Sequence, residues 1–150
     1  MSTVGCHADD REQYDIVKGF AGILEPINVL EIGCGHMRFK GLFVDYTGID
    51  SNPSVHPDEV MNATNLQFPD RSFDMVLSCT VLMHIKDTVA IEEVQRVADR
   101  YILLIETARW IGRAKPHKYE VLLSEFTKVL ELALVTSGSP LHVWLFKRRR

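Results

Sequence analysis

The sequence predicts an α/β fold, a Rossmann-like, doubly wound and mostly parallel sheet of seven strands with a C-terminal antiparallel hairpin. Three observations lead to this prediction. Short apolar runs alternate with amphipathic segments along the chain. Residues 101–105 are almost entirely apolar, as in a central parallel strand that is covered on both faces. Two apolar runs near the C-terminus flank the turn-forming residues 137–140, which is typical of a hairpin.

The individual elements follow from local patterns. Asp9 and Glu12 have the spacing of a capping box, so we expect the first helix to begin at residue 9 or 10, and Pro26 helps to end it. The predicted helices cover 9–24, 37–43, 87–98 and 118–130. The predicted strands cover 28–32, 46–50, 59–61, 73–78, 101–105, 132–135 and 141–146. Because the chain shows no internal repeat or linker, we expect residues 1–150 to form one domain.

Composition indicates an ordinary globular protein. Of the 150 residues, 46% are hydrophobic and 25% are charged. No apolar stretch approaches the roughly 18 residues of a membrane span, and residues 1–10 lack the pattern of a secretory signal. The three cysteines are scattered without metal-ligand spacing, so we expect reduced thiols, a cytoplasmic location, and neither membrane association nor a metal site.

The charge is unevenly distributed. The formal net charge is −3, but residues 147–150 are all basic, and without them 13 bases face 20 acids, a net charge of −7. Such an acidic body argues against nucleic acid as a partner. The basic tail is interpreted either as a solvated end or as a weak contact with RNA, an anionic lipid or an acidic partner.

Polar and glycine residues follow several predicted strands, where the carboxyl ends of parallel strands hold ligands. Gly33 and Gly35 come directly after the first strand and allow a sharp turn with a close approach to a ligand. Asp50 ends the second strand and offers two oxygens to vicinal ribose hydroxyls. Asn62 and Ala63 follow the third strand, where the Asn62 oxygen would accept from an adenine amine. Each feature alone also fits an ordinary turn or loop.

The order and spacing of these features resemble class I S-adenosylmethionine (SAM)-dependent methyltransferases, especially type 11 methyltransferase domains. The matching segments are 29–35, 46–50, 62–74, 78–85, 101–106 and the closing hairpin, within residues 10–146. The resemblance implies SAM as the cofactor and S-adenosylhomocysteine as its product. It implies a cofactor site formed by Glu31, Gly33, Cys34, Gly35, Asp50, Ser51, Asn62, Ala63 and Ser78, with Tyr14 as a packing residue or part of a lid.

Three features depart from the family pattern. Met37 stands where the family often has a third glycine, and Asn62 stands where it usually has Asp. The chain also has a short N-terminal cap and no insertion before the hairpin, although these parts usually bind the substrate. We therefore do not expect a conventional enclosed substrate pocket.

Two residues are candidates for catalysis. His84 follows the fourth strand and is the first candidate for a general base, because histidine titrates near neutral pH. Glu106 ends the fifth strand, where it would orient the substrate. Both also have structural interpretations, as a residue bordering the next helix and as a strand-terminal acid. His36 is expected to touch the cofactor or solvent, Arg109 and His117 are weaker candidates for residues that border the substrate, and Cys79 is expected to pack in the core.

The leading hypothesis is methyl transfer to an O, N or C nucleophile of a small-molecule substrate. The alternatives are methylation of a protein or RNA, and a SAM-binding module without catalysis that acts as a partner subunit; a homo-oligomer is also left open. A nicotinamide-dependent oxidoreductase ranks lower, because Arg38 replaces the third glycine of that motif.

Overall fold

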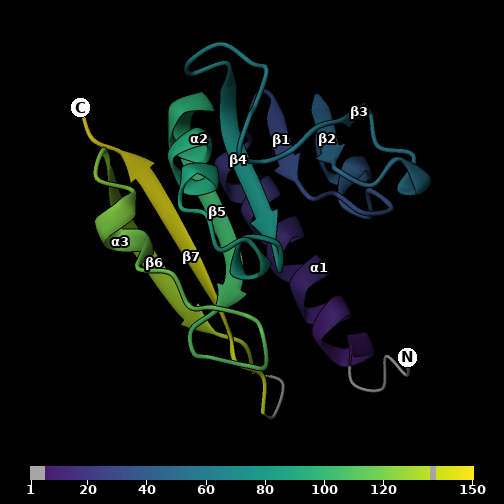
Figure 1. Ribbon diagram of the computed structural model, residues 1–150, viewed down its shortest axis with the longest axis vertical. Helices are drawn as coiled ribbons and strands as arrows, with labels where there is room; N and C mark the ends of the chain where they lie inside the picture. Colours follow the sequence, from purple (N-terminus) through teal and green to yellow (C-terminus); the bar gives the residue numbers. More distant parts are fainter. Residues whose placement is uncertain (1–5, 136–137) are drawn as a thin grey trace.

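The computed structural model describes residues 6–135 and 138–150, with side chains from residue 10 onward. One seven-stranded sheet has the order β3-β2-β1-β4-β5-β7-β6 (Figure 1). The strands are β1 (Val29–Ile32), β2 (Tyr46–Asp50), β3 (Glu59–Val60), β4 (Phe73–Cys79), β5 (Ala98–Thr107), β6 (Phe126–Ala133) and β7 (Leu141–Arg148).

The first five strands run parallel, and β7 lies antiparallel between β5 and β6. This arrangement confirms the predicted fold class. The carboxyl ends of the parallel strands therefore share one edge of the sheet, at the bottom of Figure 1. The C-terminal end of the chain lies at the opposite, upper edge.

Helices cover both faces of the sheet. Helix α2 (Val89–Val97) buries Ala90, Ile91, Val94 and Val97 against one face, and these residues recur at helical spacing. Helix α1 (Cys6–Leu24) covers the other face, where Val17 packs with Val29 and Met75. Each fully buried aliphatic side chain of this kind contributes about 1.5–3 kcal/mol.

The predicted helix at 118–130 is wrong. Only the short α3 (Tyr119–Leu122) is helical there, and Phe126–Ala133 forms edge strand β6. Phe126 is buried whereas Val129 is 51% exposed, so the apolar residues do not share one helical face. Pairing with β7 determines the structure, and a β-bulge between Lys128 and Leu130 blurs the alternation typical of a strand.

Two smaller predictions about helices also fail. The segment at 37–43 contains only the 3-10 helix η1 (Lys40–Leu42), preceded by Met37 in the left-handed region with φ 56°. Helix α1 begins at Cys6, so Asp9 lies inside the helix and does not cap it. In the predicted hairpin loop, residues 136 and 137 lie outside the described residues.

Candidate functional site

A cavity of about 450 Å³ lies at the carboxyl ends of β1, β2 and β4. The strand order reverses at β1, which pairs with β2 on one side and β4 on the other, and ligands of open α/β sheets bind at such a point. The volume falls within the range of about 300–1,000 Å³ that is usual for small-molecule and cofactor sites. The lining residues are Ile32, Gly33, Ile49, Asp50, Ser51, Met61, Asn62, Ala63, Thr64, Thr80, Val81, His84 and Ile85.

Gly33 lies where the loops after β1 and β4 meet. Its φ of 62° is in the left-handed region, which glycine adopts without steric cost. A Cβ at this position would approach Cγ2 of Val81 to 2.4 Å. Both the backbone conformation and the close contact therefore require glycine, and Val81 forms a wall of the cavity.

Asp50 has an acceptor group on the cavity. Its Oδ2 accepts from the Gly35 N–H at 3.0 Å, and its Oδ1 accepts from the Asn52 N–H at 2.9 Å. The bond from Gly35 ties residues 33–35 after β1, which we call the glycine loop, to the end of β2. Because a carboxylate oxygen accepts at more than one lone pair, each still has capacity for a ligand hydroxyl.

The Asn62 side chain presents hydrogen-bond donors to a ligand, whereas the sequence predicted an acceptor. Its Oδ1 accepts from both the backbone N–H and the hydroxyl of Thr64, at 2.9 and 2.8 Å. A backbone N–H can only donate, so the orientation of the Asn62 amide is fixed. Both lone pairs of the oxygen are thus used within the loop, and Asn62 offers its Nδ2 hydrogens to a ligand instead of an acceptor.

His84 is exposed at the cavity, in the 3-10 helix η3 (Leu82–His84) that follows β4. Thr80 and Val81 precede η3 and line the same cavity. The structure therefore brings His84 together with Gly33, Asp50 and the loop at Asn62, as the position of these residues after neighbouring strands predicts.

Glu106 lies beneath this segment and does not reach the cavity. It is fully buried, and its carboxylate accepts from the Ser78 hydroxyl at 2.8 Å. It also accepts from three successive backbone N–H groups, those of Val81, Leu82 and Met83, at 3.1–3.2 Å. Burial raises the pKa of Glu106 to about 7. Glu106, supported by Ser78, therefore holds the segment that carries His84. The sequence predicted other roles, a substrate contact for Glu106 and a cofactor contact for Ser78.

The carbonyl groups of the same segment are also held. The buried His117 donates from Nε2 to the carbonyl oxygens of Leu82 and Ile85, both at 2.9 Å. Nε2 must carry hydrogen, because both partners are acceptors. The Lys115 N–H donates to the Met83 carbonyl at 2.8 Å. Residues 81–85 are thus fixed from two sides, and we call the contacts of Glu106, His117 and Lys115 the loop clamp.

Glu31 and Cys34 lie on the α1 side of the glycine loop and do not line the cavity. Glu31 is buried, accepts from the Tyr46 hydroxyl, and has its pKa raised by burial to about 8. The buried Cys34 thiol packs close to Gly48, and burial raises its pKa to about 12. Gly35 takes part through its N–H to Asp50 and not as a lining residue.

A polar cluster joins α1 to the ends of β1 and β4. The Arg38 guanidinium donates to the Gln13 side-chain oxygen, and its Nη2 lies 3.4 Å from the Cys79 sulfur. Arg38 also contacts Asp10 at the N-terminal end of α1. Tyr14 stacks on Phe39, with ring centroids 6.2 Å apart, so it is a packing residue in this structure.

Several lining residues were not singled out from the sequence. These residues are Met61, Thr64, Thr80, Val81 and Ile85. All of them follow β3 or β4 within a few residues. Their position after the strands was a usable signal, but Met61, Val81 and Ile85 look like core residues in a sequence, and Thr64 and Thr80 look like ordinary loop residues.

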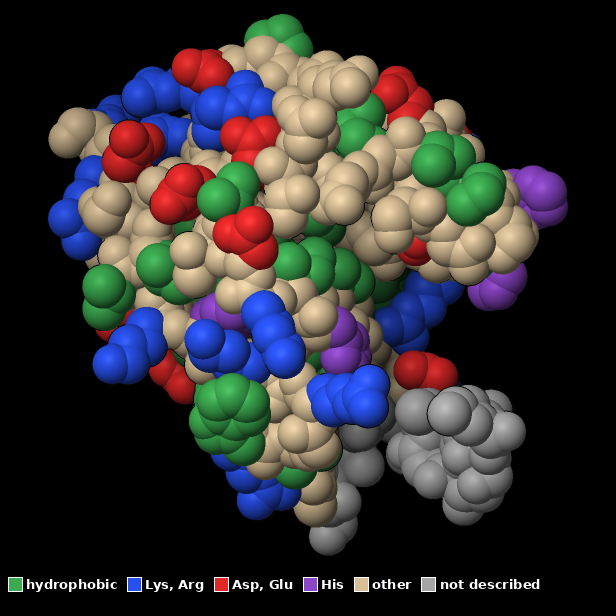
Figure 2. Space-filling view, viewed as in Figure 1, with side chains coloured by type: hydrophobic (Ala, Val, Ile, Leu, Met, Phe, Trp, Pro, Cys, Tyr) green, Lys and Arg blue, Asp and Glu red, His purple; other side chains and the backbone are tan. Residues whose placement is uncertain are grey.

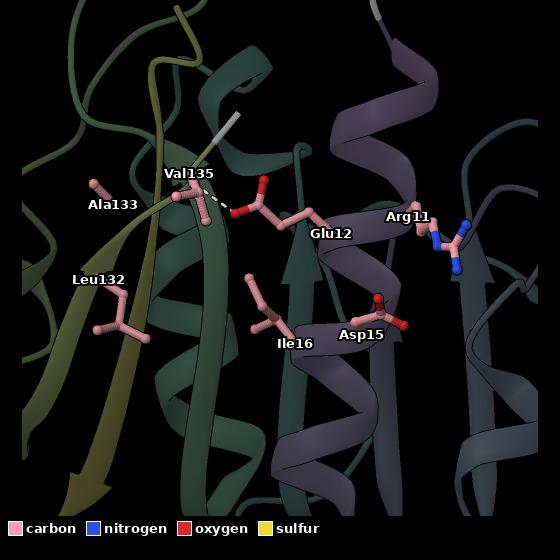
Figure 3. A pocket seen from close by; sticks show the side chains of 7 residues that line it. All are labelled: Arg11, Glu12, Asp15, Ile16, Leu132, Ala133 and Val135. Atoms are coloured by element: carbon pink, nitrogen blue, oxygen red, sulfur yellow. Dashed lines mark hydrogen bonds between the residues drawn. The ribbon is translucent and has the colours of Figure 1, made fainter. Parts of the chain in front are cut away.

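A larger hollow of about 750 Å³ lies elsewhere, between α1 and β6 (Figure 3). Ile16 faces Leu132 and Ala133 across it, and the Glu12 carboxylate accepts from the Val135 N–H at its rim. Its walls are mostly apolar, and none of its lining residues lines the cavity at the ends of β1, β2 and β4. It offers no set of groups suited to a nucleoside.

Among residues 6–135 and 138–150, no three His, Cys, Asp or Glu side chains come together as ligands of a metal ion. None of the helices in this part has the length and apolar character that crossing a bilayer requires.

The fold and the cavity define a class of protein, the Rossmann-like α/β proteins with a ligand-sized cavity at the carboxyl ends of the parallel strands. Residues 30–101 match the family described as a methyltransferase domain. No curated protein matches the chain. The match over residues 30–101 bears out the resemblance, seen in the sequence, to class I SAM-dependent methyltransferases, a family whose cofactor is S-adenosylmethionine.

Solved structures share the fold over nearly the whole chain. Magnesium protoporphyrin IX methyltransferase from Synechocystis PCC 6803 with bound SAM has a TM-score of 0.78 and 16% identity, covering 99% of this chain and 86% of that chain. The N-methyltransferase NodS from Bradyrhizobium japonicum WM9 has a TM-score of 0.74 and 15% identity, covering 99% of this chain and 100% of that chain. A 1,6-didemethyltoxoflavin-N1-methyltransferase from Burkholderia thailandensis has a TM-score of 0.70 and 14% identity, covering 98% of this chain and 85% of that chain.

Proposed function

We propose that this protein transfers the methyl group of SAM to an O, N or C nucleophile of a small metabolite. One observation carries the proposal. Gly33, Asp50, Asn62 and His84 come from loops after different strands and line the same cavity at the point where the strand order reverses. Two proteins of similar structure, a magnesium protoporphyrin IX methyltransferase and a 1,6-didemethyltoxoflavin-N1-methyltransferase, act on small molecules, which supports a small-molecule acceptor.

The residues of the cavity fit the cofactor. The remaining lone pairs of Asp50 suit the two ribose hydroxyls, and the Asn62 amide and the Ala63 backbone lie where the base would be held. Gly33 keeps the loop after β1 free of a side chain. When bound, SAM supplies an electrophilic methyl group on a sulfonium, so the protein needs only to position the nucleophile and to accept a proton where the nucleophile carries one.

His84 is the proposed proton acceptor. It is exposed on the cavity, and the loop clamp fixes the backbone on which it stands. A fixed base costs less ordering entropy in the transition state than a mobile one. The loop after β5 exposes Trp110 to 65% and Ile111 to 45%, which supports an acceptor with an apolar part.

Ligand-induced stabilisation tests the cofactor. SAM and S-adenosylhomocysteine should raise the melting temperature in a concentration-dependent way, and NAD should leave it unchanged. Stabilisation by NAD alone would overturn the assignment. Methyl-labelled SAM incubated with a metabolite extract then tests transfer, and label recovered in protein or RNA instead would redirect the proposal to a macromolecular acceptor.

A SAM-binding module without catalysis is the second candidate. The observation that favours it is chemical: within the described lining of the cavity, Asp50 and His84 are the titratable side chains. If His84→Gln left the rate of transfer unchanged, His84 would not be the base. If SAM bound but no label moved in any extract, alone or with a partner protein added, the module would be the better description.

A further inference from the structure

A second, cationic pocket of about 250 Å³ lies at the opposite end of the sheet from the proposed active site. It is formed where β5 begins and β7 ends, together with the turn before β4. Its basic lining residues are Arg71, Arg100, Lys147, Arg148, Arg149 and Arg150, and Asp99 is its acidic one. Figure 2 shows Lys and Arg side chains gathered at the upper left, where β7 ends in Figure 1.

Two of these cations already have carboxylate partners. Arg148 pairs with Glu125 at 2.5 Å, and its other nitrogens donate to backbone carbonyls, including that of Ala98 at 2.7 Å. Arg100 makes two bonds to the Asp74 carboxylate, at 2.5 and 3.1 Å. These two arginines support the structure around the pocket.

The other four cations have no carboxylate partner among the described residues. The Arg149 side chain donates to the Thr127 hydroxyl at 3.1 Å. For the side chains of Arg71, Lys147 and Arg150, the described residues provide no acceptor. In a protein with a net charge of −3, cations gathered around one concave surface raise the electrostatic energy, and a bound anion would lower it.

The backbone presents these side chains in a defined arrangement. The Arg71 backbone has a φ of 53°, and its N–H donates to the Arg96 carbonyl at 2.8 Å. The Arg149 N–H donates to the Glu125 carbonyl at 2.9 Å. The basic residues at the end of β7 are thus held against the fold near the pocket, and are not only a solvated tail.

We propose that this pocket binds a compact, multiply charged phosphoryl anion, such as pyrophosphate or the polyphosphate chain of a nucleotide. Guanidinium groups match phosphate oxygens in geometry as well as charge. The size of the pocket suits a ligand of a few atoms, and the acidic remainder of the chain repels an extended polyanion. Asp99 would repel the anion directly.

Calorimetric titration of the whole protein with pyrophosphate, in phosphate-free buffer, tests the proposal. Pyrophosphate should bind at least about tenfold more tightly than sulfate at equal ionic strength, and its affinity should fall as salt is raised. The double variant Lys147→Gln/Arg149→Gln should lose at least about tenfold in affinity. Arg11→Gln, a matched change on the exposed surface of α1, should bind as the unchanged protein does.

Asp99→Asn separates a binding site from a patch that only supports the fold, because removing this carboxylate should strengthen pyrophosphate binding severalfold. Equal binding of sulfate and pyrophosphate, or unchanged affinity in the double variant while circular dichroism shows it folded, would overturn the proposal. Tight binding of a single-stranded RNA oligonucleotide without binding of pyrophosphate would overturn it in favour of nucleic acid. SAM-induced stabilisation should be the same in all these variants, so the proposed function is tested separately.

Discussion

At the scale of single residues, Asp50 has two tasks, because it holds the glycine loop and faces the cavity. Asp50→Ala should weaken SAM binding by roughly 1.5–3 kcal/mol, the range for hydrogen bonds to a charged group. Calorimetry with SAM measures the change. Asp45→Ala, at an exposed position just before β2, is the matched control and should bind SAM normally. A folded Asp50→Ala protein with unchanged affinity would exclude Asp50 from the cofactor site.

Asn62 leads to a gain-of-affinity prediction. Because Thr64 uses both lone pairs of Oδ1, the present amide cannot also accept from an adenine amine. In Asn62→Asp, one oxygen can keep the Thr64 contacts while the other accepts from the base, so SAM should bind up to about 1 kcal/mol more tightly.

Its control addresses the charge itself. Asn65→Asp, three residues along the same exposed loop, adds the same negative charge without lining the cavity and should change SAM affinity little. Equal tightening in both variants would mean that the positively charged cofactor responds to the general field and not to an acceptor at residue 62.

The sequence predicted part of the site because of where residues stand along the strands. Gly33, Asp50 and His84 follow strand ends, and such residues meet at one edge of a parallel sheet. Glu31 and Glu106 occupy comparable positions but turn into the protein, where Tyr46 and backbone N–H groups satisfy them. A sequence does not show whether a strand-end acid meets a ligand or the protein's own donors.

At the scale of elements, the loop clamp makes a local prediction. Glu106→Gln replaces one acceptor oxygen by a donor that faces backbone N–H groups, so at least one of Val81, Leu82 and Met83 loses its partner. Hydrogen exchange should accelerate in residues 79–86, and the protein should lose roughly 1–3 kcal/mol of stability.

Ligand binding gives this variant a second measurement. SAM should bind more weakly to Glu106→Gln because Val81 and His84 line the cavity, although Glu106 itself does not. Glu92→Gln, at an exposed position of α2, is the control for both measurements. Exchange that rises evenly through the whole chain, without a local maximum at 79–86, would show that Glu106 serves only global stability.

Helices and strands were predictable where the spacing of the apolar residues along the sequence matched the side chains that are buried. Helix α2 and strand β4 bury strictly periodic or continuous apolar faces, and their predicted and observed bounds nearly coincide, whereas β5 extends beyond its predicted apolar run 101–105 to Ala98–Thr107. Strand β6 is an edge strand, with Val129 and Leu132 about half exposed, so its pattern carries little information about period. Its structure depends on pairing with β7, a non-local interaction that a window of sequence does not contain.

At the scale of the whole molecule, the two ends of the sheet differ in chemistry. The carboxyl edge carries the cavity with Asp50 and His84, and the opposite edge carries the cationic pocket around Lys147 and Arg149. The net charge of −3 hides this division. Because screening limits interactions between exposed charges to about 8–10 Å at physiological salt, each end presents its own field to ligands.

The two buried acids of the sheet predict how stability depends on pH. Burial raises the pKa of Glu31 to about 8 and that of Glu106 to about 7, from an ordinary value of 4.5. Between these limits the native state keeps protons that the unfolded chain has released. The stability of the native protein is therefore greatest below the ordinary pKa and falls as pH rises through the raised values, by up to about 1.4 kcal/mol per pH unit for each group.

Urea unfolding measured at pH 5, 6, 7 and 8 should accordingly show a free energy of unfolding that declines across this range. Glu31→Gln cannot ionise but still accepts from the Tyr46 hydroxyl, so its free energy of unfolding should decline less steeply between pH 5 and 8. Glu59→Gln, at an exposed position in β3, should keep the original profile. A Glu31→Gln profile parallel to that of the unchanged protein would mean that Glu31 is ionised in the native state, and that Arg38, close enough to lower its pKa, compensates its burial.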